Sequence, residues 1–275
     1  MALLKKSRRR VVQTVSLIAL NTNLVAVLSL RRFCLPIMNC EACTFAWLGC
    51  PVGMMSRSIA FLQVPWLVIG GVLLVGAVMG RFLCGWVCPM GFLQDLLYKI
   101  RGPKFRLPAF TSWFKYAFLL VTVVGVAYFV QDYENSKLFF CRYCPTSAIQ
   151  VMGPNLLGGG VALDSFFVLK VSVLALVVVL AIAHHRSFCK VMCPVGAMVA
   201  LTNRFSLFSI RLKKDQCIEC RKCDRSCPMD VPVSQSKEHG KPVNRKLECI
   251  GCLSCEESCP TGAIETKRRR FTSAG

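Results

Sequence analysis

Four apolar segments, each close to the length of a membrane-spanning helix, recur along the first two thirds of the chain and constrain its fold more than any other feature. They cover residues 11–30, 64–83, 113–130 and 165–183. A helix needs roughly 20 apolar residues to cross the hydrocarbon core of a bilayer. The pattern therefore predicts a membrane domain of four transmembrane helices.

The opening stretch KKSRRR, followed by an apolar run, would also suit a signal peptide. No small-x-small cleavage site follows it, and the run is long for the apolar region of such a peptide. We therefore interpret residues 11–30 as a retained first span.

The composition fits a membrane protein better than a nucleic-acid-binding protein, although the net charge is +20. Hydrophobic residues make up 54% of the chain and charged residues only 17%, and a nucleic-acid binder as basic as this would rarely be so apolar. Lys and Arg beside apolar segments are typical of membrane proteins that face anionic lipid. We expect membrane lipids, and no nucleic acid, among the partners.

The distribution of Lys and Arg predicts the orientation in the membrane. Five of them precede the first span and six fall within residues 81–115, whereas the loops 31–63 and 131–164 hold three and two. By the positive-inside rule both termini lie in the cytoplasm, although Arg31 and Arg32 run against this assignment. The expected location is the inner or cytoplasmic membrane of a bacterium or archaeon, which the chain crosses several times.

The composition becomes polar after about residue 211, so we expect a membrane domain over 1–210 and a cytoplasmic domain over 211–275. The second domain holds CIECRKCDRSCP and CIGCLSCEESCP, both of the form C-x2-C-x2-C-x3-C-P. This is the spacing of bacterial two-cluster ferredoxins, in which the fourth cysteine of each run ligates the other cluster. A zinc ribbon is the alternative, but its cysteine pairs usually lie farther apart.

The spacing predicts two 4Fe–4S clusters with crossed ligand sets in an α+β ferredoxin-like fold. One set is Cys217, Cys220, Cys223 and Cys259, and the other is Cys249, Cys252, Cys255 and Cys227. Two adjacent clusters suit one-electron transfer.

The membrane domain carries further cysteine motifs at the ends of its spans. C-x3-C-P occurs after the second span and after the fourth, and each half reads span, outer Cys–Pro motif, span, inner Cys–Pro motif. Two halves that run the same way imply a pseudo-twofold axis along the membrane normal, across which like motifs face each other. We predict an all-α membrane fold of two parallel repeats, with one inner 4Fe–4S cluster on Cys84, Cys88, Cys189 and Cys193.

The outer loops hold a second group of cysteines, from which four could ligate an outer cluster: Cys40, Cys43, Cys50, Cys141 and Cys144. Proline after cysteine suits the first turn of a helix, whose N-terminus stabilises a thiolate or an anionic cluster. Disulfides in an oxidising compartment are one alternative, and a thiol–disulfide relay is another. Buried cysteines can also be small core residues, but the repeated pairing with proline argues against this.

Two titratable residues near the inner motifs are candidates for a quinone site. His184 ends the fourth span and could accept a proton from a quinol, and Asp95 follows Cys88 on a short predicted helix. The simpler interpretations are a histidine at the membrane interface and a charge on a helix surface.

The motifs GRFLCGWVCPMGFLQDL and SFCKVMCPVGAMVAL, followed by the two ferredoxin runs, resemble those of NapH-like polyferredoxin-type membrane proteins over roughly residues 64–265. NapH is the quinol-dehydrogenase membrane component of periplasmic nitrate reductase systems, and related motifs occur in NosR-type proteins and in a cytochrome oxidase assembly group. The resemblance implies four spans, cytoplasmic ferredoxin clusters and electron transfer from menaquinol or ubiquinol. It supports the inner four and the C-terminal eight cysteines, whereas the outer cysteines depart from the nitrate-reductase pattern.

We therefore expect a membrane-bound iron–sulfur protein that acts as the electron-transfer subunit of a quinol-dehydrogenase-type oxidoreductase. Its partners would be quinone or quinol and other redox subunits, including a periplasmic or peripheral iron–sulfur or cytochrome protein. Two alternatives remain open, namely an assembly or maturation factor that supplies electrons to a metalloenzyme, and a transmembrane thiol–disulfide relay.

Overall fold

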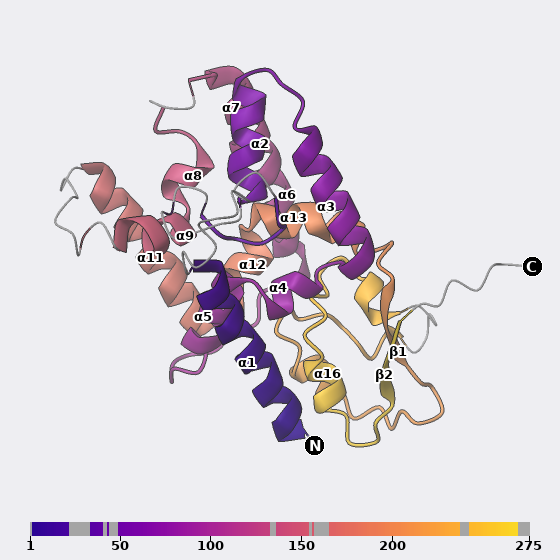
Figure 1. Cartoon of the computed structure of the whole chain (residues 1–275). Helices are drawn as coiled ribbons and strands as arrows, with labels where there is room; N and C mark the ends of the chain where they lie inside the picture. The colour runs from indigo at the N-terminus through magenta and orange to yellow at the C-terminus, as the bar shows by residue number, and fades with distance from the viewer. Residues whose placement is uncertain are drawn as a thin grey trace, which may run out of the picture.

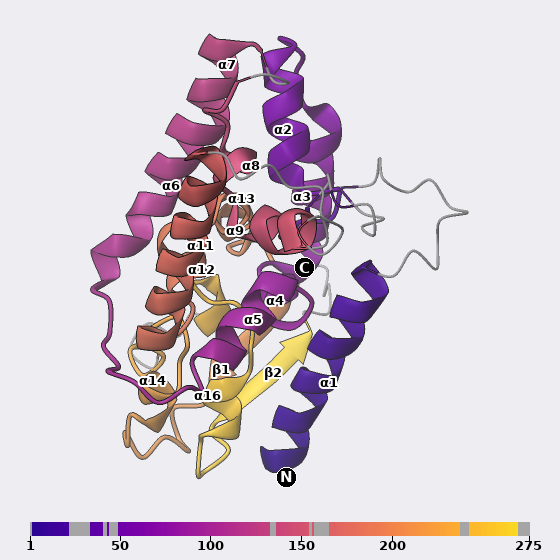
Figure 2. The same cartoon turned by 90° about the vertical axis from the view of Figure 1, so that its left-hand side faces the viewer.

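The computed structural model shows a bundle of helices with a small cysteine-rich unit at one end (Figure 1). In the view turned by 90°, the helices α2 and α7 lie at the end of the molecule opposite that unit, which carries α16 and both strands (Figure 2). The structure describes residues 2–21, 34–40, 43, 49–132, 136–153, 156, 165–236 and 242–268.

The helical part contains long helices joined by short helical turns that follow the Cys–Pro motifs. Its helices are α1 (Ala2–Asn21), α2 (Pro51–Ala60), α3 (Trp66–Met79), α4 (Phe82–Trp86), α5 (Pro89–Leu97), α6 (Phe114–Phe118), α7 (Val126–Val130), α8 (Phe140–Tyr143), α9 (Pro145–Ser147), α11 (Ser165–Ala183), α12 (Ser187–Val191) and α13 (Pro194–Thr202). A 3-10 turn at Ala109–Trp113 and wider π turns at Leu119–Gly125 make α6 and α7 part of one continuous helical run, and a second π segment covers Ala148–Met152.

Three of the four expected spans coincide with apolar helices, of which one has the length of a membrane span, and the first lies partly outside the described residues. Helix α11 covers the same residues as the expected fourth span. The run Ala109–Val130 covers the third, and by length and composition it alone among the described helices is long and apolar enough to cross a membrane; Trp66–Met79 and Phe167–Ala183 are shorter apolar helices. Residues 22–30 of the first expected span are not described, and α1 begins at Ala2, so it includes the basic N-terminal stretch.

The second span is shorter as a helix than the segment 64–83 suggests, for local backbone reasons. Pro65 stands immediately before the first helical residue, and α3 ends at Gly80, whose φ of +57° leaves the helical region. Glycine adopts such a conformation without the steric penalty that other residues meet. The chain therefore turns at Gly80 and starts the short helix α4 that carries the first inner cysteine.

The cysteine-rich unit contains a two-stranded antiparallel sheet in which β1 (Phe208–Leu212) pairs with β2 (Ile264–Arg268), with Phe208 opposite Arg268. Its helical turns are α14 (Lys222–Arg225), α16 (Ser254–Glu257) and a 3-10 turn at Val243–Arg245. The strand β1 begins at Phe208, slightly before the boundary that composition suggests. The α+β character expected of this domain is thus present in the described residues.

Each of the two ligand runs folds the same way. Arg221 and Leu253, which directly precede α14 and α16, both have left-handed backbones with φ of 52° and 63°. Glu219 and Gly251, two residues earlier, are also left-handed. These paired turns bend the chain around a centre, which is what three closely spaced ligands in each run require.

The cysteine-rich unit is fixed to the helical part by charged and polar contacts. Glu248 pairs with buried Arg81 at 3.1 Å and with buried Lys115 at 2.5 Å. On the other side, Lys190 lies 2.8 Å from the carboxylate of Asp230. Asn203 donates hydrogen bonds to two carbonyl oxygens of the ligand segment around residue 249, one of them 2.8 Å away. The two parts therefore share a polar interface rather than a flexible linker.

Close packing of α3 against α13 depends on Gly76. A Cβ atom placed there would lie 2.1 Å from the Oγ1 atom of Thr202, whereas one placed at Gly70, on the same helix, would meet nothing within 4 Å. We predict that Gly76→Ala lowers the free energy of unfolding by about 1–3 kcal/mol, as overpacking does.

The matched control, Gly70→Ala, should leave the unfolding midpoint unchanged or raise it slightly. Thr202→Ala removes two of the three crowding atoms, so the double variant should be less destabilised than the sum of the single changes. Thermal unfolding in detergent provides the comparison, and equal effects at Gly70 and Gly76 would contradict the packing argument.

Candidate metal centres

The two ligand sets predicted for the ferredoxin runs line two separate cavities. The first cavity is lined by Cys217, Cys220, Cys223 and Cys259, together with Leu212 and Ile264. Cys259, the last cysteine of the second run, therefore lies beside the first three cysteines of the first run, where the crossed assignment expects it. Polar side chains such as Glu219 and Arg221 also line this cavity, and Cys220 is exposed.

The second cavity is lined by the other set, Cys227, Cys249, Cys252 and Cys255. The backbone N–H of Val231 donates to the sulfur of Cys227 at 3.3 Å, a contact that stabilises a thiolate ligand and tunes a cluster. Burial, together with the nearby sulfurs of Cys252 and Cys249, raises the pKa of Cys227 to about 12. Four soft donors around one cavity fit a 4Fe–4S cluster.

The four inner cysteines lie together although they come from opposite halves of the chain. Burial raises the pKa of Cys193 well above its ordinary value, and the nearby sulfurs of Cys189, Cys84 and Cys88 raise it further. Cys88, Cys189 and Cys193 are buried and Cys84 is half-buried. The helical turns α4 and α12 each carry the first cysteine of a motif, and the second cysteine precedes α5 or α13.

The second cysteine of each inner motif begins a helix in the same conformation. Cys88 and Cys193 are extended, with φ and ψ of −65° and 120° and of −68° and 110°, and proline is the first helical residue in both. The sulfur of Cys193 accepts the N–H of Gly196 at 3.3 Å, and the sulfur of Cys88 accepts the N–H of Gly91. The N–H groups of the first helical turn, which have no partner within the helix, and the helix dipole both point toward the cysteine sulfur.

Two buried arginines, Arg81 and Arg186, flank the inner cysteines, with exposed fractions of 1% and 0%. Each lies three residues before the first cysteine of its motif, so the repeat reads R-x2-C-x3-C-P-x-G. Arg186 donates to the carbonyl of Cys84 at 2.8 Å, and the charge of Arg81 acts to lower the pKa of Cys84 against the effect of burial. Guanidinium groups at this position can balance an anionic cluster.

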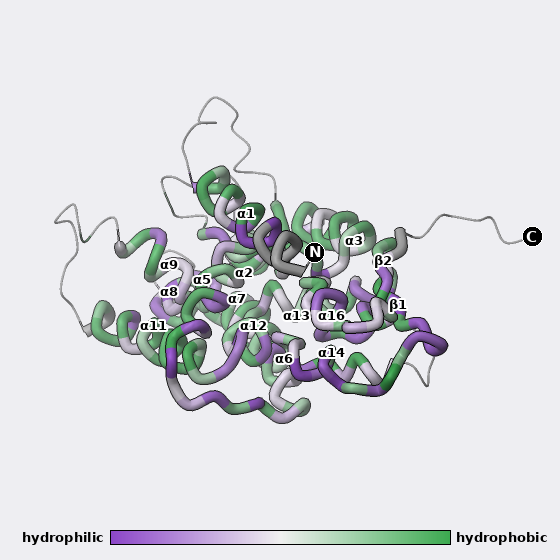
Figure 3. The backbone as a smooth tube through the Cα atoms, turned by 90° about the horizontal axis from the view of Figure 1, so that it is seen from below, coloured by the Kyte–Doolittle hydropathy of each residue, from purple (hydrophilic) through white to green (hydrophobic). Residues whose placement is uncertain are grey.

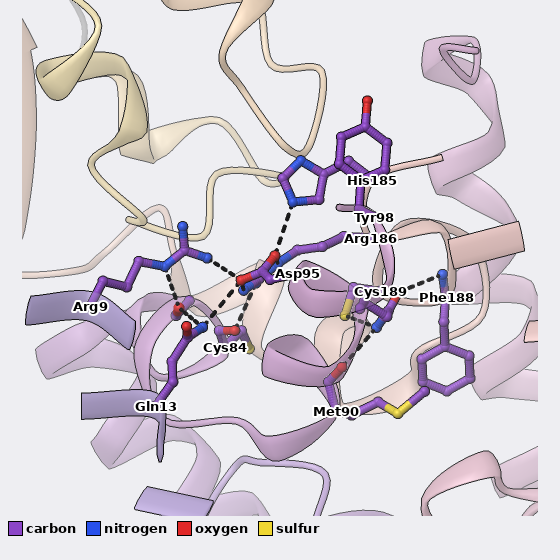
Figure 4. Close-up of polar contacts among 12 residues, drawn as sticks. Arg9, Gln13, Cys84, Met90, Asp95, Tyr98, His185, Arg186, Phe188 and Cys189 are labelled. Carbon is purple, nitrogen blue, oxygen red and sulfur yellow. Dashed lines mark hydrogen bonds and ion pairs between the residues drawn. The ribbon is translucent and has the colours of Figure 1, made fainter. Parts of the chain in front are cut away.

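Asp95 anchors Arg186 and does not face an open site (Figure 4). Its two oxygens accept from Arg186 Nε at 2.8 Å and Nη2 at 2.6 Å, and also from Arg9, Gln13 and His185. Burial acts to raise the pKa of Asp95, but the charges of Arg186 and Arg9 and the hydrogen bonds hold it well below its ordinary value. Asp95 is therefore ionised at neutral pH and fully engaged.

Gln94, which is fully buried, orients the second inner motif. Its Nε2 donates to the sulfur of Cys189 at 3.1 Å, and its Oε1 accepts the N–H of Phe188 at 3.1 Å. A hydrogen bond to a ligand sulfur is one of the ways a protein tunes a cluster. Gln94 thus joins the first half of the chain to the ligand loop of the second.

His184 lies at the junction between the helical part and the cysteine-rich unit. Its Nδ1 contacts the carbonyl of Phe105 at 2.9 Å, and its Nε2 lies 3.5 Å from the carboxylate of Asp230. Burial lowers the pKa of His184. A cavity of about 230 Å³ adjoins His184. It is lined by His184, His185, Tyr98, Arg106, Cys227 and Asp230.

The outer cysteines separate into a group of four and a fifth. A cavity of about 440 Å³ is lined by Cys40, Cys50, Cys141 and Cys144. Cys43 is buried but does not line this cavity. Among the residues that the structure describes, no three His, Cys, Asp or Glu side chains come as close as a single metal ion requires.

The sequence reasoning missed the residues that support the inner cysteines. Arg81 and Arg186 could have been found by extending the internal repeat three residues toward the N-terminus, because both halves carry the arginine. Gln94 gives no comparable signal in the opposite half, where Val199 holds the equivalent position. Arg9 belongs to a basic stretch in which no single residue stands out.

Two protein families match parts of the chain. The 4Fe-4S binding domain matches residues 61–108 and 166–214, which are the two inner Cys–Pro segments, and the 4Fe-4S dicluster domain matches residues 209–260. The prediction of 4Fe–4S clusters is thereby confirmed. No solved structure matches the chain.

Individual relatives are similar over somewhat more than half of the chain. An uncharacterized protein of Methanocaldococcus jannaschii is 31% identical over 158 residues, which cover 58% of this chain and 55% of that protein. The methylamine utilization ferredoxin-type protein MauN of Paracoccus denitrificans is 29% identical, with coverage of 63% and 59%. The regulatory protein NosR of Pseudomonas aeruginosa is 29% identical, with coverage of 54% and 20%. The matched region thus spans less than two thirds of each relative.

Removing the charge of Asp95 should destabilise the protein strongly. We predict that Asp95→Asn costs about 3–5 kcal/mol, because it leaves the buried charge of Arg186 without its partner. Glu265→Gln, which breaks the exposed pair with Lys213, should cost at most about 1 kcal/mol. Denaturant unfolding under anaerobic conditions compares the two variants, and similar midpoints would refute the anchoring role.

The pH dependence of this difference follows from the lowered pKa of Asp95. A carboxylate whose pKa is lower in the folded state contributes stability above its unfolded pKa and loses it as the pH falls through the folded value. The ordinary value is about 3.9, so the difference in free energy of unfolding between wild type and Asp95→Asn should not narrow between pH 8 and pH 5. A difference that closes within this window would contradict a lowered pKa.

Proposed function

We propose that this protein is a multi-pass membrane electron-transfer protein that passes single electrons between the quinone pool and its ferredoxin-type clusters through an inner cluster on Cys84, Cys88, Cys189 and Cys193. The observation that carries the proposal is the meeting of these cysteines beside two buried arginines, next to the cysteine-rich unit. When bound, 4Fe–4S clusters supply one-electron redox chemistry.

Apolar side chains exposed along the long helices support membrane insertion. Leu74 on α3, Phe129 on α7 and Val168 on α11 are each more than 60% exposed, and α1 exposes Val15. Figure 3 shows hydrophobic stretches along α3 and α11, whereas hydrophilic stretches gather around the two strands. Apolar surface on this scale needs a cover, and lipid is the cover that apolar helices of this kind ordinarily have.

The proposed topology has four spans, with both termini and the cysteine-rich unit in the cytoplasm. The concentration of Lys and Arg in the N-terminal tail and in residues 81–115 supports this orientation. The inner motifs and the ferredoxin runs then share the cytoplasmic side. In this topology the loops that carry Cys40, Cys50, Cys141 and Cys144 lie on the opposite side of the membrane.

Direct contact between the inner motifs and the second ferredoxin site supports electron transfer between them. Cys189 packs in one apolar cluster with Cys252 and Cys255. A Cβ atom at Gly85 would lie 2.5 Å from the carbonyl of Ile250, so α4 approaches the ligand loop at backbone distance. Trp86 adds a hydrogen bond to this contact, because its Nε1 donates to the carbonyl of Gly251 at 3.1 Å.

Quinol is the electron donor that the resemblance to NapH-like proteins suggests. The cavity lined by His184, Tyr98 and Asp230 adjoins Cys227, a proposed ligand of the second ferredoxin cluster. His184 could take up a proton that a quinol releases, whereas the carboxylate of Asp230 is already paired with Lys190. Asp95 is a poor acceptor by comparison, since its carboxylate is held by two arginines, and we assign it to positioning Arg186.

The ferredoxin-type relatives and the clustering of cysteines favour electron transfer over a thiol–disulfide relay. A relay needs pairs of cysteines that alternate between thiol and disulfide, whereas the inner sulfurs form a group of four with arginine charges beside it. An assembly factor that supplies electrons to a metalloenzyme would use the same internal path, so it differs only in the final acceptor.

The inner cluster can be tested by removing two of its ligands. In Cys88→Ser/Cys193→Ser, the iron content should fall by about four atoms per chain, while about eight remain in the ferredoxin sites. Reduction of these remaining clusters by a quinol analogue should be lost, although dithionite should still reduce them. The measurements are iron and labile sulfide per chain with EPR spectra.

Cys43→Ser is the matched control, because Cys43 belongs to neither cluster site of the proposal, and it should keep both the iron content and the quinol-driven reduction. Unchanged iron in the double variant would refute the inner cluster. Lost iron with normal quinol-driven reduction would refute its place in the electron path.

A further inference from the structure

Four cysteines from two distant segments surround one cavity of the helical part. Cys40 and Cys50 come from the first outer loop and Cys141 and Cys144 from the second, and together they line a space of about 440 Å³. One water molecule occupies a share of roughly 30 Å³ in the liquid, so the cavity can hold a group of many atoms. Soft sulfur donors from both halves face the same space.

The outer Cys–Pro motifs have the same backbone geometry as the inner ones. Cys50 and Cys144 directly precede Pro51 and Pro145, and their φ and ψ values are −77° and 131° and −59° and 126°. Their sulfurs accept backbone N–H groups from the first helical turn, as those of the inner motifs do. A geometry that prepares a sulfur to ligate a cluster therefore occurs on both sides of the bundle.

A glutamine supports each site from the same position in its motif. Gln94 follows Cys88 by six residues and Gln150 follows Cys144 by six residues. The Oε1 of Gln150 accepts the backbone N–H of Cys40 at 2.7 Å, and its Nε2 donates to Asn21 and Asn39. Like Gln94, Gln150 reaches from one half of the chain to the first cysteine of the other half's motif.

Positive charge surrounds the outer cavity. Arg57, Arg142 and Lys170 line it, and among its described lining residues there is no carboxylate. Lys170 donates from Nζ to the hydroxyl of Ser147 at 3.0 Å, which fixes one of the charges at the cavity wall. A cluster with four thiolate ligands is an anion, and these cations would balance it.

We propose that Cys40, Cys50, Cys141 and Cys144 ligate a further 4Fe–4S cluster, and that Cys43 is not a ligand. This deepens the proposed function, on which it rests for the path to the outer site, because it places a redox centre on the side opposite the ferredoxin domain.

The two membrane sites share one segment of backbone. The N–H of Met38 donates to the sulfur of Cys88, while Met38, Asn39 and Cys40 line the outer cavity. Cys88, Cys193 and Cys144 also belong to one continuous apolar core. The outer loop therefore dips toward the inner site, so the two centres need not be separated by the full thickness of the bilayer.

The test is the iron and labile sulfide content of the full chain, purified anaerobically and reconstituted with ferrous iron and sulfide. Wild type should hold about sixteen irons, Cys50→Ser/Cys144→Ser about twelve, and the control Cys43→Ser about sixteen. The EPR signals of the two ferredoxin clusters serve as the internal measure of correct folding in each variant. Alkylation followed by mass spectrometry reports the state of the outer cysteines.

The outcomes separate this inference from the proposed function. About twelve irons in wild type, falling to about eight in Cys88→Ser/Cys193→Ser but unchanged in Cys50→Ser/Cys144→Ser, would overturn the outer cluster and leave the inner one standing. About twelve irons in wild type that fall to about eight in Cys50→Ser/Cys144→Ser, but stay unchanged in Cys88→Ser/Cys193→Ser, would support the outer cluster and overturn the inner one. Outer cysteines that become alkylated only after reduction would also overturn the proposal, because they would be disulfides. Loss of iron in Cys43→Ser would overturn the ligand assignment.

Discussion

A group of thiolate ligands inside an apolar bundle needs positive charge beside it, and the buried arginines meet this requirement. Desolvating an anion without a partner is costly, so the sulfur sites and the cations must be built together. Arg186 is held by Asp95 and Arg81 by Glu248. The guanidinium groups are thus fixed by carboxylates on one side and remain available to the sulfurs on the other. Much of the polar structure between the helices serves this arrangement.

The same requirement explains why the cysteine-rich unit docks where it does. Glu248 lies immediately before Cys249 in the chain, and it pairs with Arg81 and Lys115 from the helical part. The carboxylate that positions Arg81 is therefore also the one that fixes the ligand loop of the second ferredoxin site. This ion-pair network therefore contributes, with the Lys190–Asp230 pair, to the relative position of the two candidate metal centres.

The ferredoxin sites were largely predictable from the sequence, because three ligands of each set are neighbours along the chain and the fourth follows from the known spacing. The pairing of Cys84 with Cys189 was accessible through the internal repeat. The distinction between Cys43 and the other outer cysteines was not, because it depends on how a loop folds rather than on any spacing. The ion pair between Arg9 and Asp95 could not be predicted from the sequence either, because the two residues are 86 positions apart.

Helix boundaries were harder to predict than ligand sets. Apolar residues occur on both sides of Gly80 and Arg81, and so the sequence suggests a span over 64–83, whereas the helix ends at Met79. Part of the apolar character of the segment reflects burial against the second half of the chain, because Gly76 packs on Thr202. Local backbone chemistry at Pro65 and Gly80 decides the actual bounds.

The contacts of Asp95 also have a consequence for the order in which the protein can be built. Arg9 and Gln13 leave the ribosome before Asp95, whereas Arg186 follows it by 91 residues. A chain that has been synthesised only through its first half contains Arg9, Gln13 and Asp95, but it lacks Arg186, which donates to the carbonyl of Cys84. The four cysteines of the proposed inner site are all present only when synthesis has passed Cys193. A cluster on these four cysteines would therefore be completed only after the second half of the chain has been made.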